Sequence, residues 1–355
     1  MLALVAAAAA LAGCTELGYY ARLAGGHLGR VARAEPVEAL LADPATPPRL
    51  RERLRLARAM VRFAAAELGL PADGSYARYV DLGGRWPAWA VFAAPRRRMA
   101  LLAWCHPVVG CLGYRGFLDE ARARAFARRL AQQGYDVHVG PVAAYSTLGW
   151  TEDLITSSML AWPEPQLAAL VFHELAHRRV YVPGATAFNE AYATAVQRAG
   201  VRRWLRRRGR LRALAAWERE EAMAQAMAAL VARYRRRLAA AYAAPGTAAE
   251  RMQARAALAR ALRAEYLRLR ARLGSEAWDG WTLSGLNNAK LLAFATYRED
   301  VPAFECLLAA AGGEIARFHA RMAALARLDA AARRRALARA CLSGAGAGGA
   351  RAGSG

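Results

Sequence analysis

Residues 171–177 read Val171-Phe172-His173-Glu174-Leu175-Ala176-His177. On a helix, His173 and His177 are one turn apart and project from the same face, so both imidazoles can reach one metal ion. Glu174 then lies beside the metal rather than on it, where a general base must stand to take a proton from a metal-bound water. The stretch therefore predicts a helix that carries two metal ligands and a catalytic base.

A third ligand is expected thirteen residues after His177, in the segment Phe188-Asn189-Glu190-Ala191. Catalytic zinc usually has three protein ligands and one open position, and two histidines with one carboxylate supply that set. A turn signal at Val182-Pro183-Gly184 predicts a chain reversal, and a second helix from about Thr186 then carries Glu190 in its first turns. We therefore predict a Zn²⁺ site with these ligands: His173, His177 and Glu190.

The alternative is a pair of surface histidines on an amphipathic helix that binds no metal. The chain has six histidines in 355 residues, so this motif is expected by chance in roughly half a per cent of chains of this composition. The run Leu167–Phe172 is also too apolar for an exposed helix. Both observations favour the metal site.

The chain is strongly basic, with a formal net charge of +23 and a pI near 11.0. Lys290 is the only lysine, and the arginines are spread along helices together with many alanines, which is typical of a genome-wide compositional bias. No zinc finger, glycine-rich phosphate loop or aromatic-basic RNA motif accompanies the charge. Nucleic-acid binding is therefore the weaker interpretation, and attraction to an anionic membrane or acidic envelope polymers is at least as plausible.

The first residues form a short apolar segment that ends in Leu11-Ala12-Gly13-Cys14. A segment of this length is typical of a secretory signal and too short to span a bilayer. Its end looks like the lipobox of bacterial lipoproteins, which predicts cleavage before Cys14, lipidation of its thiol and, with Thr15 next, an outer-membrane location. No Lys or Arg precedes the segment, which leaves an upstream start codon open; the alternative is a fortuitous alanine-rich terminus.

Export would place the other cysteines in an oxidising compartment. Cys105 and Cys111 bracket a short loop that a disulfide could close, although a Cys-His metal pair with His106 is an alternative. Cys306 and Cys341 are a weaker candidate for a second bridge, and one of them could instead be a buried thiol.

Periodicity predicts helices over 36–42, 48–69 and 118–133, and strands over 89–94, 99–104 and 135–139. The first two strands are expected to form a hairpin at Pro95-Arg96. His138 is interpreted as a partnered sheet residue rather than a ligand. Residues 144–153 are expected to be an extended segment near the site, where a peptide could add as a further strand.

The metal helix is expected to begin after Trp162-Pro163-Glu164-Pro165, and the Glu190 helix to stop at Gly200. Residues 202–273 predict an antiparallel helical hairpin, broken at Ala244-Pro245-Gly246 and restarted by a capping box of Thr247 and Glu250. Two further helices are expected, over 285–298 and 300–339.

The expected fold class is α+β and predominantly helical, with a zincin-like small sheet, the metal helix and the long hairpin. The predicted organisation is a signal peptide (1–13), a tether (14–35), one metallopeptidase domain (36–340) and a disordered tail (341–355). The domain divides into N-terminal helices and sheet, zinc-binding helices, the hairpin and C-terminal helices, over these ranges: 36–160, 161–200, 201–275 and 276–340.

Five segments together have a family resemblance: residues 145–150, 173–177, 188–191, 286–289 and 297–304. On these segments the chain resembles a family of bacterial lipoproteins described as zinc aminopeptidases, within the gluzincin-type metallopeptidases. The resemblance covers nearly everything from Cys14 to about residue 330. It implies a peptidase that acts on peptides or proteins, is attached to the membrane through Cys14 and does not bind nucleic acid.

The resemblance implies the roles of the site residues. His173, His177 and Glu190 would bind zinc, and Glu174 would be the general base. Thr194, one turn beyond Glu190, stands where relatives carry an acid that orients a ligand histidine. The donor to the developing oxyanion is expected among four tyrosines, of which Tyr297 is favoured and Tyr192 is better explained by core packing: Tyr145, Tyr181, Tyr192 and Tyr297.

An aminopeptidase also needs a carboxylate near the zinc for the free α-amino group of its substrate. Glu152 and Asp153 are the acids closest in sequence to the expected substrate strand at Tyr145, although Asp153 could instead cap the next helix. Three interpretations follow: an aminopeptidase, an endopeptidase that processes envelope proteins, and a non-enzymatic envelope assembly lipoprotein. Glu174 argues against the last, because a structural site needs no general base.

Overall fold

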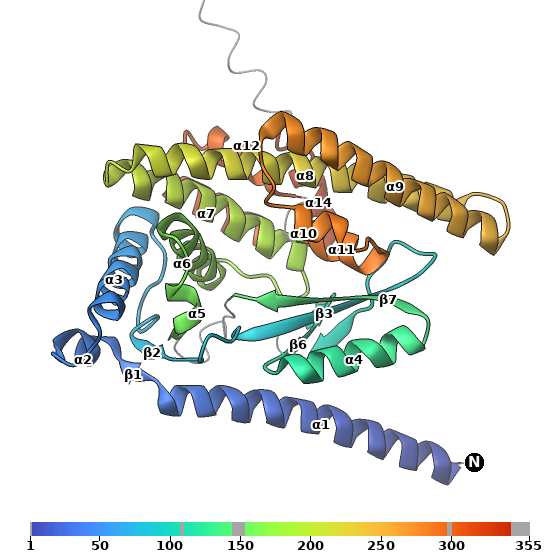
Figure 1. Cartoon of the computed structure of the whole chain (residues 1–355), viewed down its shortest axis with the longest axis horizontal. Helices are drawn as coiled ribbons and strands as arrows, with labels where there is room; N and C mark the ends of the chain where they lie inside the picture. Colours follow the sequence, from blue (N-terminus) through green and yellow to red (C-terminus); the bar gives the residue numbers. More distant parts are fainter. Residues whose placement is uncertain (1, 107–109, 144–152, 297–299, 342–355) are drawn as a thin grey trace, which may run out of the picture.

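The computed structural model describes residues 2–106, 110–143, 153–296 and 300–341 (Figure 1). It confirms the predicted α+β class: most of this part of the chain is helical, and its strands form three small sheets. None of the helices in these ranges is long and apolar enough to cross a membrane.

The two helices expected to carry the metal ligands pack side by side (Figure 1). They are α6 (Glu164–Arg179), which begins with a proline in its first turn, and α7 (Thr186–Arg207). The prediction that the second helix stops at Gly200 is wrong. A Cβ at Gly200 would lie 2.7 Å from both Leu68 and Phe172, so this glycine permits close packing inside α7 rather than ending it.

The helix α3 (Pro48–Leu68) packs against the α6–α7 pair and confirms the helix expected there. Its Phe63 ring lies 5.7 Å from that of Phe172 on α6 and 5.2 Å from that of Trp204 on α7. The largest hydrophobic core is buried among these helices. Because one face of α6 is held in this core, its opposite face is turned toward the central sheet.

The central sheet has the strand order β6-β3-β7 and is antiparallel throughout. Its strands are β6 (Arg115–Phe117), β3 (Ala88–Pro95) and β7 (Tyr135–Val142). The helix α4 (Glu120–Gln132) packs on one face of the sheet, and α11 (Asn288–Thr296) packs on part of the other. The rest of that second face looks toward α6 and α7.

The predicted hairpin between residues 89–94 and 99–104 is wrong. β3 pairs with β7 over its whole length, with Phe92 opposite His138. After the turn, Leu102 N donates a backbone hydrogen bond to Ala93 O at 2.8 Å, but residues 99–103 do not form a strand beside β3. Because the paired residues are 40 to 54 positions apart in the sequence, from Pro95–Tyr135 to Ala88–Val142, the local alternation could not identify the true partner.

A small ribbon lies next to the sheet and contains the predicted disulfide between Cys105 and Cys111. Its strands are β4 (Trp104–His106) and β5 (Gly110–Leu112). Gly110 has φ +77°, and a Cβ at this position would lie 2.7 Å from the backbone nitrogen of Gly184. The ribbon therefore packs directly on the turn that joins α6 to α7.

The segment expected to be a tether is instead part of a helix, α1 (Leu2–Arg33). Alanine, leucine and arginine favour helix strongly enough to outweigh the scattered glycines. This helix contacts the domain, since Tyr20 Oη lies 2.6 Å from His106 Nδ1 in the ribbon and Tyr19 Oη donates to Gly116 O at 3.0 Å. An ion pair between Arg115 and Glu16 adds to this interface.

The predicted helical hairpin forms an arm of two long helices, α8 (Leu211–Ala243) and α9 (Ala248–Leu273). The predicted capping box is confirmed, because Thr247 and Glu250 exchange side-chain and backbone hydrogen bonds at the start of α9. A short helix, α10 (Asp279–Leu283), leads from the arm into α11.

The single helix expected over 300–339 is wrong, because three helices occupy that range. They are α12 (Val301–Ala310), α13 (Ile315–Ala326) and α14 (Ala330–Ala338). Gly312 and Gly313, both with positive φ, end α12, and the Asp329 side chain caps α14. A second disulfide, the weaker of the two expected, joins Cys306 to Cys341.

The remaining elements lie between the N-terminal helices and α6. A second sheet has the order β1-β2-β8, and two short helices flank it. These elements are β1 (Glu35–Pro36), α2 (Val37–Ala42), β2 (Arg78–Val80), β8 (Ile155–Thr156) and α5 (Ser157–Leu160).

Candidate metal centre and cavity

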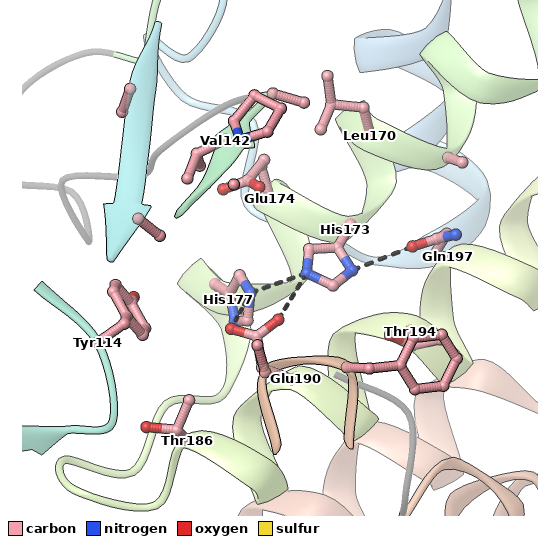
Figure 2. Close-up of a pocket in the computed structure, with 18 of the residues that line it drawn as sticks. Tyr114, Val142, Leu170, His173, Glu174, His177, Thr186, Glu190, Thr194 and Gln197 are labelled. Carbon is pink, nitrogen blue, oxygen red and sulfur yellow. Dashed lines mark hydrogen bonds and ion pairs between the residues drawn. The ribbon is translucent and has the colours of Figure 1, made fainter. Parts of the chain in front are cut away.

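The structure brings the side chains of His173, His177 and Glu190 together (Figure 2). His173 Nε2 lies 3.1 Å from His177 Nε2 and 3.1 Å from Glu190 Oε2, and His177 Nε2 lies 3.8 Å from Glu190 Oε1. Both imidazoles come from consecutive turns of α6, and the carboxylate comes from the second turn of α7. The three form a group that could bind a metal ion.

The spacing of these donor atoms is compatible with one shared metal ion, because one ligand atom from each residue can be chosen so that all three lie within 4.8 Å of one another. Bonds of about 2.0–2.2 Å to a tetrahedral centre separate the donors by about 3.3–3.6 Å. The shortest separations, 3.1–3.8 Å, are close to that range, although His173 is nearest to Oε2 of Glu190 and His177 to Oε1. Two imidazole nitrogens and one carboxylate also form a donor set that zinc accepts while keeping one position open.

The tight connection between the two helices is closed by one amide side chain. Asn189 Oδ1 accepts a hydrogen bond from Val182 N at 2.8 Å, and Asn189 Nδ2 donates to Val182 O at 2.9 Å. Asn189 is only 2 % exposed, so these bonds are shielded from water. They fix the start of α7 against the end of α6 and place the neighbouring Glu190 at the histidines.

The residue that orients His173 is Gln197, which the sequence analysis did not identify. Its Oε1 lies 3.0 Å from His173 Nδ1, two helical turns beyond Glu190. Thr194, expected in this role, lines the cavity but is not the partner of His173 Nδ1. Because Nδ1–H donates to the amide oxygen, Nε2 is left as the lone-pair nitrogen that faces the other ligands.

The protonation of the two histidines differs in the protein alone. Burial lowers the pKa of His177 to about 4, so its imidazole is neutral near pH 7. Burial also opposes the charging of His173, but the hydrogen bond and charge of Glu190 outweigh it and raise the pKa of His173. The same contact lowers the pKa of Glu190 despite its burial. A metal ion would therefore displace a proton from His173.

Glu174 lies beside the histidines rather than among the ligands (Figure 2). Burial raises the pKa of its carboxyl to about 7; the positive charge of His173 opposes this rise, and the charges of Glu190 and Asp153 add to it. A carboxyl with a pKa near neutral pH can both accept and release a proton, as a general base followed by a general acid must.

Asp153, a predicted substrate residue, is not among the described residues that line the cavity, but its charge raises the pKa of Glu174. It is 6 % exposed and accepts a hydrogen bond from Ser75 Oγ at 3.3 Å. Its backbone oxygen accepts from Tyr76 N at 2.7 Å. The structure thus places Asp153 where its charge acts on Glu174.

The ligands face a cavity of about 740 Å³ between the α6–α7 pair and the uncovered face of the central sheet. The sheet side has a floor of small residues that leaves room for a substrate: Ala88, Ala90, Gly116 and Gly140. Aromatic side chains form much of the remaining wall: Phe92, Tyr114, Trp162, Trp217, Trp281 and Phe294. His138 also lines the cavity and stacks on Phe92, as expected of a sheet residue.

The tyrosines expected as candidate oxyanion donors lie in different environments. Tyr181 lines the cavity, whereas Tyr192 is fully buried and its hydroxyl lies 2.8 Å from His319 Nδ1, in agreement with a packing role. Three predicted site residues lie outside the described residues: Tyr145, Glu152 and Tyr297. Tyr114 faces the ligand group but was missed, because nothing in its sequence neighbourhood marks it as part of the site.

Fold and site together define a helical α+β protein with a His-His-Glu group that could bind metal. A family model described as "Putative aminopeptidase" matches residues 18–337 of the chain. The match covers most of the sequence, and the chain belongs to this family. No curated protein and no solved structure matches the chain.

Proposed function

We propose that the protein is a zinc-dependent peptidase that removes residues from the free N-terminus of peptides. The observation that carries the proposal is the joint position of the three ligands and Glu174 on one wall of a cavity large enough for a peptide end. Membership of the aminopeptidase family supports the choice of reaction.

The side chains have separate roles in this reaction. His173, His177 and Glu190 would hold the ion, which when bound supplies Lewis acidity toward the carbonyl and lowers the pKa of a water. Glu174 takes a proton from the attacking water and later gives it to the leaving amine. Gln197 keeps His173 in the tautomer that can bind the ion.

Two further carboxylates on the cavity wall support an amine-bearing substrate. Glu220 and Glu221 both come from α8. Glu221 already forms an ion pair with the buried Arg198, whereas Glu220 is exposed and accepts a hydrogen bond from Gln166 Nε2 at 3.0 Å. Negative charge here favours a substrate that brings a free α-amino group.

The proposal is tested with the purified protein, a fluorogenic peptide library and the variant Glu174→Gln. We expect zinc-dependent cleavage of peptides with a free N-terminus, and a fall of about 10²–10⁴-fold in turnover in the variant. Zinc content should stay unchanged, because Glu174 is not a ligand.

Two other outcomes would replace the proposal. Equal cleavage of peptides with blocked and free N-termini would indicate an endopeptidase. Equal inertness of the wild-type protein and Glu174→Gln on the whole library would favour a non-enzymatic envelope protein.

The cellular location is a separate part of the proposal. We propose a lipid anchor on Cys14, facing the periplasm from the outer membrane, on the basis of the Leu11-Ala12-Gly13-Cys14 motif. Cells that express the protein should incorporate labelled fatty acid into it, and Cys14→Ser should abolish the incorporation. Labelling that persists in Cys14→Ser would rule out this anchor.

A further inference from the structure

Peptide hydrolysis needs a donor on the side of the site where the carbonyl oxygen becomes an oxyanion. His173 is held by Gln197 on the α7 side (Figure 2). In the same view Tyr114 lies on the opposite side of the cavity, with His177 and Glu190 between it and Gln197. Tyr114 therefore faces the ligand group from the side that α6 and α7 leave open.

Two of the buried tyrosine hydroxyls in the described residues are paired with other side chains, and the hydroxyl of Tyr114 is not. Tyr192 pairs with His319, and Tyr242 donates to Asn288 at 2.9 Å. Tyr114 Oη has no hydrogen-bonding partner within the described part of the chain, although its ring is packed on Phe92. A partly buried tyrosine hydroxyl normally finds a partner, and here the available one is a molecule in the cavity.

The surroundings of Tyr114 keep its hydroxyl a donor. Burial raises its pKa, and the negative charges of Glu190 and Glu174 raise it further. The hydroxyl thus stays protonated near pH 7.

The position of Tyr114 is fixed by the disulfide ribbon. Tyr114 follows β5 by two residues, and β5 is closed on β4 by the Cys105–Cys111 bridge. The ribbon in turn packs on Gly184, in the turn between the two ligand helices. The ribbon closed by the Cys105–Cys111 disulfide therefore supports both Tyr114 and the turn between α6 and α7.

We propose that the Tyr114 hydroxyl donates a hydrogen bond to the oxygen of the scissile carbonyl as negative charge develops there. This inference rests on the proposed function. The water oxygen bonds to the carbonyl carbon while Glu174 takes a water proton. The C–N bond then breaks as Glu174 passes that proton to the leaving amine. Tyr114 keeps its own proton throughout.

The test compares Tyr114→Phe with the wild-type protein, both loaded with zinc, on the best peptide from the library. We expect kcat to fall by about 10²–10³-fold, as on removal of an oxyanion donor, with KM changed by less than about threefold. Zinc content and the thermal midpoint should be unchanged. A phosphinic peptide, which mimics the tetrahedral species, should lose affinity by a factor similar to the loss in kcat.

The control variant is Tyr135→Phe, which removes a hydroxyl from the far end of the same sheet and should keep full activity. Tyr181→Phe and Tyr297→Phe test the competing donors. A loss of about a hundredfold in either of these, with Tyr114→Phe within about threefold of wild type, would overturn the inference.

Two further outcomes are also decisive. If Tyr114→Phe loses zinc or unfolds at a lower temperature in proportion to its loss of activity, the role of Tyr114 is structural and the inference is wrong. If the wild-type protein cleaves no peptide, the proposed function fails and the inference with it. An active, zinc-dependent wild type with a fully active Tyr114→Phe removes the inference alone.

Discussion

At the scale of single residues, Gln197 shows how a neutral side chain can orient a ligand. Its Oε1 accepts from His173 Nδ1 at 3.0 Å. The sequence had instead suggested Thr194, which stands where some relatives carry an acid that orients a ligand histidine. An amide oxygen fixes the tautomer of the histidine without adding a full negative charge. The electrostatic pull on His173 therefore comes from Glu190 and Glu174.

The first prediction concerns this contact. Gln197→Ala should weaken zinc binding by about 10–100-fold, because His173 loses the partner that orients it. Gln197→Glu should restore the affinity, since a carboxylate accepts the same hydrogen bond. Competition with a chromophoric chelator measures both, and equal affinities in all three proteins would contradict the assignment.

The second prediction concerns pH. The pKa of His173 is raised, so below that pKa a proton occupies the nitrogen that zinc needs. Zinc affinity should therefore fall as pH falls, by up to about tenfold per pH unit for the one proton displaced. His177 should add no dependence above its pKa of about 4. Isothermal titration at several pH values in buffers of different ionisation enthalpy counts the released protons; a flat affinity would refute this account.

At the scale of elements, the disulfide ribbon is the part that connects separate regions. The ribbon contacts α1, because its His106 is hydrogen-bonded to Tyr20. It also packs on Gly184, in the turn between α6 and α7, and the chain continues from it through Tyr114 into β6. A ribbon of two three-residue strands is marginal by itself, so the covalent bridge supplies much of its order.

The third prediction removes that bridge. The double variant Cys105→Ser, Cys111→Ser should lower the unfolding free energy by about 2 kcal/mol, the value for a short closed loop. Turnover should fall because Tyr114 and the ligand turn are less well held. Cys306→Ser with Cys341→Ser is the matched control, since that bridge joins α12 to the chain beyond α14, away from the cavity lining. Equal turnover in both double variants would contradict the role of the ribbon.

At the scale of the whole molecule, the helical arm is tied to the sheet. Arg255 of α9 forms a 2.8 Å ion pair with Asp136 of β7, and Asp136 also accepts from Asn288 N at 3.0 Å. Asp136 is 8 % exposed, so these partners take the place of water around its carboxylate. The N-terminal half of α8 contributes Trp217 and Glu220 to the cavity, which makes the arm part of the site as well as a scaffold.

The fourth prediction concerns this connection. Arg255→Ala should destabilise the protein by about 1.5–3 kcal/mol, because Asp136 keeps its burial but loses its closer charged partner and retains only the exposed Arg96 at 4.0 Å. Arg260→Ala, on the exposed part of the same helix, should change stability by less than about 0.5 kcal/mol. Urea unfolding of both variants measures the difference, and equal midpoints would show that the arm and the sheet are not coupled through Asp136.

The local pattern was sufficient where the chemistry is local. The spacing of His173 and His177, the turn before Thr186 and the capping box at Thr247 all depend on a few consecutive residues, and each could be predicted from them. The same holds for the Cys105–Cys111 bridge, because its short loop brings the two thiols together.

Only the tertiary structure decided which residues from distant segments face the ligands. The pairing of β3 with β7, the passage of α7 through Gly200, and the approach of Gln197 and Tyr114 to the ligand group all depend on packing between segments far apart in sequence. Side-chain periodicity records which face of an element is buried but not which neighbour buries it. For that reason the sequence determined the three side chains that could bind a metal and the proposed base beside them, whereas packing determined the residues that surround them.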